Sequence, residues 1–206
     1  MGLCRFNALS GYGIHPPVTR RVAVRPETDQ ASADAALVDQ ARSGDVEARE
    51  QLVRRYLPDV YRTTIRVLGD PDLAQDAAQD AFVNAMRGLR RFRGDASFRT
   101  WLLRIAINAA RSVGRRHGRR REVSLVLAEN EPSTVPDPAR HAMNVTEMER
   151  AERALGGLPP KQRMAVALRV QQGLSYTEIA VALQCSEGAA RVNYHLGVKR
   201  LRELLR

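Results

Sequence analysis

The chain has 206 residues, which suits one domain or two small ones, and its 33 Lys and Arg against 23 Asp and Glu give a formal net charge of +10. That excess favours a polyanionic partner, because clustered cations release counterions from phosphates. No apolar run reaches the length of a membrane span, and residues 1–30 lack the apolar core of a signal peptide. Cys4 and Cys185 lie far apart without metal-binding spacing, so we expect no disulfide framework, metal or other cofactor, and a cytoplasmic location.

Residues 1–33 hold several glycines and prolines with little periodicity, which is typical of a mobile arm or of an upstream extension from a misassigned start codon. Helical patterning follows. A short apolar repeat predicts a first helix that ends at Gly44, and Asp45 is placed to cap a second. Pro58 interrupts or kinks this second helix, which continues to Gly69.

A third helix is predicted to open at Asp70, with Pro71 in the first-turn position that proline favours. Its apolar arc is wide, and an acidic stripe edged by glutamine lies outside that arc. Acids near a helix N-terminus also stabilise the helix through its dipole. The pattern therefore leaves two interpretations open, a docking surface for a basic partner and a solvated face. The residues outside the arc are Asp72, Asp76, Asp80, Val83 and Arg87, with Gln75 and Gln79 at its edge.

The segment 92–116 organises the rest of the chain, because it predicts a helix with two different faces. The apolar face consists of Phe98, Trp101, Leu102, Ile105, Ala109 and Val113. The polar face repeats as Arg104, Asn108, Arg111 and Arg115. Asp95 or Ser97 is placed to cap the helix. Folding gains nothing from aligned like charges, so the second face is either solvated or meets a polyanion.

The loop before this helix holds Arg91, Phe92 and Arg93, and its aromatic ring is either a stacking platform for an unpaired base or a plug in the core. After the helix, residues 115–144 carry a basic run, which extends the cationic stripe or begins a linker. From about residue 123 prolines and acids follow, a composition typical of a tether. We expect a domain boundary here and two domains that move independently.

The second domain, residues 145–206, is predicted to be helical and to end in a helix-turn-helix. Ser175 begins a capping box that opens a short helix over 176–183. Ser186 is placed to cap the long final helix over 187–205.

Apolar residues of the final helix are expected to lie mostly in the core, and they are Val192, Leu196, Leu201 and Leu205. Cys185, in the turn before that helix, is either a redox switch or a small buried turn residue.

At this point two segments resemble a known family. The run DLAQDAAQDAFVNAMRGLRRFRGDASFRTWLLRIAINAARSVGRR resembles region 2 of an extracytoplasmic-function (ECF, group 4) sigma factor of the sigma-70 family. The run LGGLPPKQRMAVALRVQQGLSYTEIAVALQCSEGAARVNYHLGVKRLRELL resembles its region 4. The resemblance implies an all-α fold of two small helical domains, region 2 over 34–114 and region 4 over 145–206, joined by a flexible acidic linker.

The resemblance also assigns roles to residues. It implies that polymerase docks on Asp76, Gln79, Asp80 and Val83. It implies that the promoter −10 element meets Arg91, Phe92, Arg93, Ser97, Arg104, Asn108, Arg111 and Arg115. It implies that the −35 element meets Ser186, Glu187, Ala189, Ala190, Arg191, Tyr194 and Lys199.

The partners that the resemblance implies are core RNA polymerase, through its beta-prime clamp helices and beta flap, promoter DNA and an anti-sigma factor. The expected function is promoter-specific initiation for a stress or envelope response. A rival class is a stand-alone repressor or activator, which would bind DNA tightly without polymerase. An enzyme acting on DNA is a third class, but no carboxylate cluster, activated serine or glycine-rich phosphate loop supports catalysis.

Overall fold

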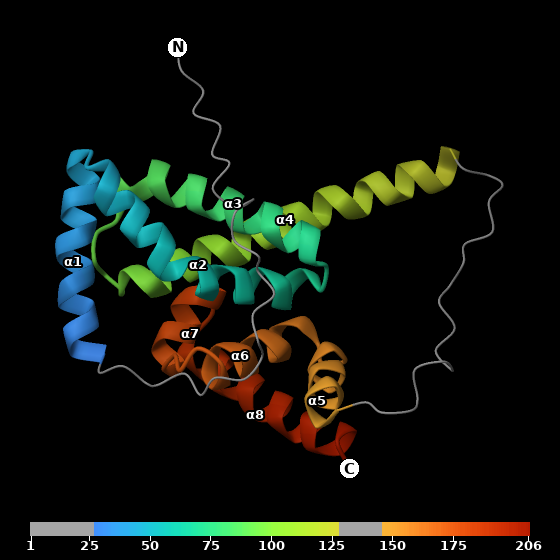
Figure 1. Ribbon diagram of the computed structural model, residues 1–206. Coiled ribbons are helices and arrows are strands. Elements are labelled where there is room, and N and C mark those ends of the chain that lie inside the picture. The colour runs from blue at the N-terminus through green and yellow to red at the C-terminus, as the bar shows by residue number, and fades with distance from the viewer. Residues whose placement is uncertain (1–26, 128–145) are drawn as a thin grey trace.

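The computed structural model describes residues 27–127 and 146–206, and in these ranges every regular element is helical (Figure 1). The first group of helices is α1 (Glu27–Ser43), α2 (Val46–Leu68), α3 (Pro71–Gly88), η1 (Leu89–Arg91) and α4 (Phe98–Leu127). The second group is α5 (Glu147–Gly156), α6 (Pro160–Val170), α7 (Tyr176–Leu183) and α8 (Glu187–Leu204). The all-α prediction is confirmed for the described part of the chain. The expected arm, residues 1–33, lies outside the described part up to residue 26, whereas residues 27–33 begin α1. The expected linker, residues 115–144, lies outside it over 128–144, whereas residues 115–127 continue α4.

The predicted caps are the ones that the structure uses. Asp45 accepts hydrogen bonds from the backbone of Glu47 and Ala48 at the start of α2. Asp70 caps α3 in the same way, with proline in the first turn. Pro58 lies inside α2, and the helix continues through it without a break. Helix starts depend on local chemistry, so the sequence could place them.

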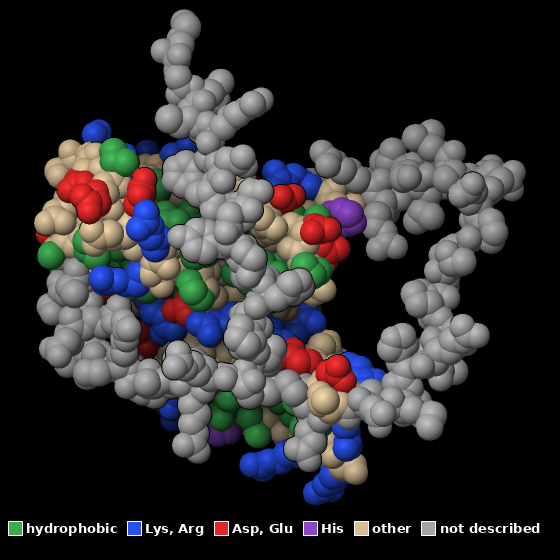
Figure 2. All heavy atoms as spheres, viewed as in Figure 1, with side chains coloured by type: hydrophobic (Ala, Val, Ile, Leu, Met, Phe, Trp, Pro, Cys, Tyr) green, Lys and Arg blue, Asp and Glu red, His purple; other side chains and the backbone are tan. Residues whose placement is uncertain are grey.

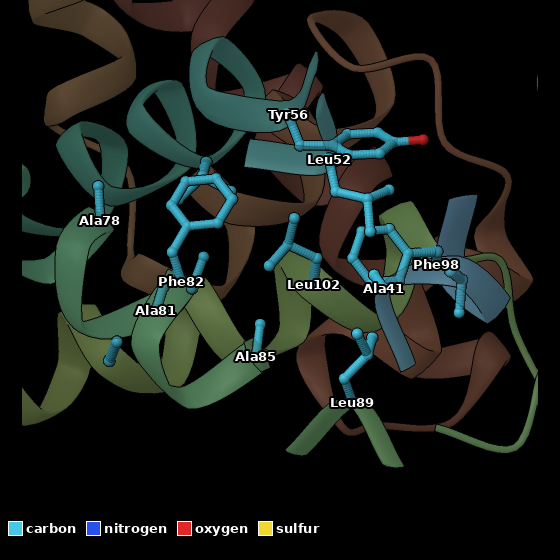
Figure 3. Close-up of a cluster of buried hydrophobic side chains, with 14 of the residues drawn as sticks. Ala41, Leu52, Tyr56, Ala78, Ala81, Phe82, Ala85, Leu89, Phe98 and Leu102 are labelled. Carbon is cyan, nitrogen blue, oxygen red and sulfur yellow. The ribbon is translucent and has the colours of Figure 1, made fainter. Parts of the chain in front are cut away.

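The four N-terminal helices close around a core built from all of them (Figure 3). Its centre is aromatic, since the Phe98 ring centroid lies 5.5 Å from that of Tyr56 and 5.7 Å from that of Trp101. Leu52 and Leu102 beside them are fully buried. The predicted apolar face of the α4 segment is therefore confirmed.

A buried polar group attaches α1 to this bundle. The Asp34 carboxylate forms an ion pair with Arg55 at 2.5 Å and accepts a hydrogen bond from the Tyr56 hydroxyl. Burial, and then this hydrogen bond to an anion, raise the pKa of the Tyr56 hydroxyl far above its usual value. The tyrosine therefore stays a donor at all physiological pH, and Asp34 has the partners that a buried charge requires.

The C-terminal helices pack around a second core, to which the first group contributes. Leu168 and Ile179, on α6 and α7, share one buried cluster with Leu103 and Ile107 of α4. A smaller cluster joins α5 to α6 and α8. In Figure 1 α7 and α6 lie directly beneath α2 and α4, and α8 lies on the side of its domain that faces away from them.

Hydrogen bonds surround this junction between the two groups of helices. The Arg99 guanidinium donates to the Asp59 carboxylate at 2.7 Å and to the Gln172 carbonyl at 2.8 Å. The buried Gln172 amide donates back to the Thr63 hydroxyl at 2.8 Å. Arg66 and Glu152 form a two-pronged ion pair between α2 and α5. Figure 2 shows Lys and Arg side chains gathered in a band where the upper bundle meets the lower helices.

The two domains are thus in extensive contact, which differs from the expectation that they move independently. The reason is physical: that expectation came from the linker, whose composition carries no information about the surfaces it connects. Leu103 and Ile107 belong to a third face of α4, outside both predicted faces.

Candidate nucleic-acid interface

The polar stripe of α4 lies on the outer part of that helix. Asn108 and Arg115 are exposed, while Arg104 and Arg111 are half-buried. None of the three arginines forms an ion pair with another residue that the structure describes. The helix continues to Leu127, so the backbone of the basic run is helical as well. Arg104, Arg111 and Arg115 form a cationic helix face of the kind that phosphates attract.

The start of α4 is capped by Ser97, one of the residues predicted to contact DNA. The Ser97 hydroxyl accepts a hydrogen bond from the Thr100 backbone at 3.1 Å and lies 2.9 Å from the Thr100 hydroxyl. Thr100 in turn donates to the Glu178 carboxylate of α7 at 3.1 Å. Ser97 is therefore a helix cap, as predicted, and remains exposed beside the stripe.

The loop before α4 divides between solvent and core. Arg91 and Arg93 are exposed, but Phe92 packs with its ring centroid 5.1 Å from Trp101 and 5.8 Å from Phe98. Its carbonyl also accepts a hydrogen bond from Arg42. The partly buried ring packs against the aromatic core, which favours the interpretation as a plug, and the −10 contact of Phe92 stays a prediction.

The acidic stripe of α3 lies outside the core, as predicted. Asp76 and Gln79 are exposed, and Val83 keeps 41% of its surface in solvent. Asp80 has a partner, since Arg116 on the extended part of α4 approaches its carboxylate to 2.8 Å. The proposed docking face is therefore less acidic at Asp80 than the sequence alone indicates.

The helix-turn-helix is formed by α7 and α8. Ser175 and Glu178 make the predicted capping box, and Ser186 caps α8 by accepting from the backbone of Ala189. Gln184 ends α7 in the left-handed conformation, with φ of 56°. These local contacts fix the tight turn between the two helices.

A polar and aromatic cluster holds Arg191 in place on α8. Its guanidinium lies 4.9 Å from the centre of the Tyr176 ring and 3.0 Å from the Glu187 carboxylate. Glu187 also accepts a hydrogen bond from the Thr177 hydroxyl at 3.0 Å. That hydrogen bond first, and then the one from Arg191, lower the pKa of the Glu187 carboxyl. Arg191 is thus pre-oriented by α7 and by its own helix.

The structure corrects which residues of α8 face outward. Ser186, Glu187, Arg191 and Lys199 are exposed, as predicted for −35 contacts. Ala189 and Tyr194 are half-buried. Ala190 is fully buried, so its side chain packs in the core and cannot reach a DNA groove.

Exposed positions that the sequence analysis missed are Val192, His195 and Leu196. Val192 and Leu196, which were expected in the core, keep 56% and 48% of their surface in solvent, and Leu205 is 41% exposed. The exposure of Val192 and Leu196 could have been predicted by counting helical turns from the Ser186 cap. The prediction failed because apolar side chains were assumed to be buried. Cys185 is exposed as well, so it is not the buried turn residue of the second interpretation.

Two further observations concern membrane spans and metal sites. Among the described helices, none combines the length and apolar character that a membrane crossing needs. Among the described residues, no group of three or more His, Cys, Asp and Glu side chains is placed to hold a metal ion.

Comparison with known proteins matches both groups of helices. Residues 52–120 match the family Sigma-70 region 2, and residues 148–201 match Sigma-70, region 4. The RNA polymerase sigma-H factor of Pseudomonas aeruginosa is 39% identical over 166 residues, which cover 77% of this chain and 86% of that protein. The ECF RNA polymerase sigma-E factor of Escherichia coli K12 is 36% identical over 166 residues with the same coverage.

Solved structures agree. CnrH, in complex with the cytosolic domain of CnrY, superposes with a TM-score of 0.62 at 28% identity and covers 84% of this chain and 97% of its own. The sigma factor RpoE of Bartonella quintana, in complex with the anti-sigma factor NepR, gives 0.62 at 27% identity and covers 78% of this chain and 98% of its own. With both regions matched in order along the chain and relatives aligned over most of their length, this protein belongs to the sigma-70 family and, within it, to the extracytoplasmic-function sigma factors.

Proposed function

We propose that this chain binds core RNA polymerase in the cytoplasm and directs promoter-specific initiation of transcription, without catalytic activity of its own. The observation that carries the proposal is the pairing, in one chain, of a basic helix face on α4 with a helix-turn-helix at α7 and α8. A stand-alone repressor requires only the second of these. The matches to Sigma-70 regions 2 and 4 support a single function that uses both the basic face of α4 and the helix-turn-helix.

Region 2 would contribute two surfaces. The exposed face of α3 with Asp76, Gln79 and Val83 is placed to dock on a basic surface of polymerase, the beta-prime clamp helices in the family. The outer stripe of α4 would meet the −10 element. Arg104 and Arg111 in this stripe are half-buried, which restricts the movement of their side chains. Cations at this spacing bind phosphates without reading sequence.

Region 4 would read the −35 element through the early part of α8. Arg191 is the best-positioned residue for a base edge, because Tyr176 and Glu187 restrict its guanidinium before DNA arrives. An arginine held in this way reads guanine through two hydrogen bonds, worth about 1–3 kcal/mol of discrimination. Lys199, exposed further along the helix, suits a phosphate contact.

An anti-sigma factor is the third proposed partner, after polymerase and DNA. The support is that RpoE, a similar structure, was solved in complex with an anti-sigma factor. The exposed face of α3 is a candidate surface for such an inhibitor, since one occupant excludes another.

The test measures promoter binding by the purified chain with and without core polymerase. We expect weak, salt-sensitive binding by the chain alone and specific binding once polymerase is present. Asp76→Arg should reduce co-purification with core polymerase while leaving the fold intact, and Asp45→Ala, which removes only a helix cap, serves as a control for general destabilisation. Tight sequence-specific binding without polymerase would instead establish the stand-alone regulator.

A further inference from the structure

We propose that two exposed apolar side chains of α8, Val192 and Leu196, read thymine methyl groups in the −35 element. The inference rests on the proposed function of region 4 as a DNA reader and deepens it, because it names the bases. Its starting point is the face of α8 that the structure leaves in solvent.

The two side chains share the outer face of the helix. They are spaced by four residues, so they lie one above the other on α8. The opposite face of α8 packs against α5, α6 and α7, with Ala190 and Gly197 buried there. Region 2 contacts α7 and α6, and Figure 1 places α8 away from it. The apolar pair is therefore exposed while the two domains are in contact.

Their position along the helix matches a reading site. Val192 comes five residues after Glu187, the first residue of α8, or about 8 Å along the axis at about 1.5 Å per residue. In a helix-turn-helix the early residues of the second helix enter the major groove. Arg191, which precedes Val192, is already oriented by Tyr176 and Glu187. The apolar pair thus lies directly beside the best candidate for a base contact.

The chemistry of the groove selects the base. Among the major-groove edges only thymine presents an apolar group, its C5 methyl, and the other edges present hydrogen-bond donors and acceptors. Covering a donor or acceptor with valine or leucine removes water without replacing its hydrogen bond, which is unfavourable. Arg191 and Lys199 on the same helix supply positive charge for the adjacent phosphates. DNA with thymine beneath Val192 and Leu196 therefore fits this surface better than an apolar protein partner does.

The experiment uses holoenzyme reconstituted from the full chain and core polymerase. A promoter library randomised in the −35 element is selected for binding, and each enriched thymine is then replaced by deoxyuridine, which removes only the methyl group. We expect at least one replacement to weaken binding about fourfold, the value of one buried methyl-sized group. The Val192→Ala holoenzyme should lose that sensitivity. Val170→Ala is the matched control, because Val170 is equally apolar, 65% exposed and on α6.

The outcomes distinguish a failure of the thymine-methyl inference from a failure of the proposed function. Deoxyuridine without effect at all thymines, or unchanged sensitivity in Val192→Ala, would overturn the inference and indicate a protein occupant instead. If holoenzyme selects no promoter at all, the proposed function fails, which is a different result.

Discussion

The two regions of this protein differ in how they complete their cores. Region 2 buries its aromatic centre with its own helices, and every member of that cluster lies between α1 and α4. The main cluster of region 4 includes Leu103 and Ile107, which belong to α4 of region 2. Region 4 therefore borrows part of its packing, and separating the domains affects region 4 more than region 2.

Helix α4 makes this asymmetry possible because its three faces have three different surroundings. Phe98 and Leu102 face the core of region 2, and Leu103 and Ile107 face region 4. The stripe that includes Asn108 faces outward. A single helix thus joins the fold of one domain, the docking of the other and the proposed DNA contact. The difference between neighbouring residues on α4 allows the comparison to be tested directly.

Leu102→Ala should give the largest effect. Leu102 is fully buried in the core of region 2, so the substitution removes packing and leaves a cavity worth about 2–5 kcal/mol of unfolding free energy. Chemical denaturation followed by the fluorescence of Trp101 measures the loss. Val83→Ala on exposed α3 is the control and should change little. A loss below about 1 kcal/mol for Leu102→Ala would contradict a self-contained region 2 core.

Leu103→Ala, one residue away, should behave differently. Leu103 is as buried as Leu102, but its partners are in region 4. We expect region 2 to unfold close to its normal midpoint while region 4 separates from it or melts earlier. Hydrogen exchange of α6 and α7 measures that separation. Equal destabilisation of both regions by the two leucine variants would remove the proposed asymmetry.

Gly197→Ala should destabilise region 4 alone. A Cβ atom at Gly197 would approach the Val166 side chain to 2.7 Å and the Gln162 carbonyl to 3.2 Å, where α8 crosses α6. Overpacking of this kind costs about 1–3 kcal/mol. The melting of region 4 reports it, and Gly188→Ala, at a position with open space around it, is the control. An unchanged region 4 would mean that the crossing adjusts freely.

Acid should weaken the contact between the regions by the smallest amount. The hydrogen bond from Arg66 lowers the pKa of the Glu152 carboxyl. The stabilisation is therefore complete above the ordinary glutamate pKa of about 4.3 and is lost as the pH falls through the lowered value. Glu152 is partly exposed, so we expect less than about 1 kcal/mol. Energy transfer between the domains, followed from about pH 6 to pH 3, should fall less in Glu152→Gln than in wild type. Identical curves would exclude this ion pair as a contributor.

Local features of the fold were predictable from the sequence. Asp45, Asp70, Ser175 and Ser186 cap the helices that they were expected to cap, because a cap depends on residues within one turn. The inner face of α4 was likewise visible as a helical repeat. The contact between the regions was not, since Leu103 and Gln172 meet partners far away in the chain.

The sequence predicted the candidate site in outline. Errors arose where the size or polarity of a side chain suggested the wrong degree of burial. Ala190 is small enough to be buried beneath α8, whereas Val192 is apolar and yet exposed. Phe92 was open to two interpretations, and only the packing of its ring against Trp101 favours one of them, the plug in the core. The pairing of Asp80 with Arg116 links α3 to a part of α4 that the sequence left between helix and linker.

The most direct test of the central claim, a polymerase-dependent initiation factor, is to map RNA 5′ ends made in vitro by core polymerase on genomic DNA with and without this chain. We predict start sites that appear only when the chain is present and that share two upstream elements at a fixed spacing, one for each region. Absence of chain-dependent starts from an active polymerase, together with sequence-specific DNA binding by the chain alone, would contradict it.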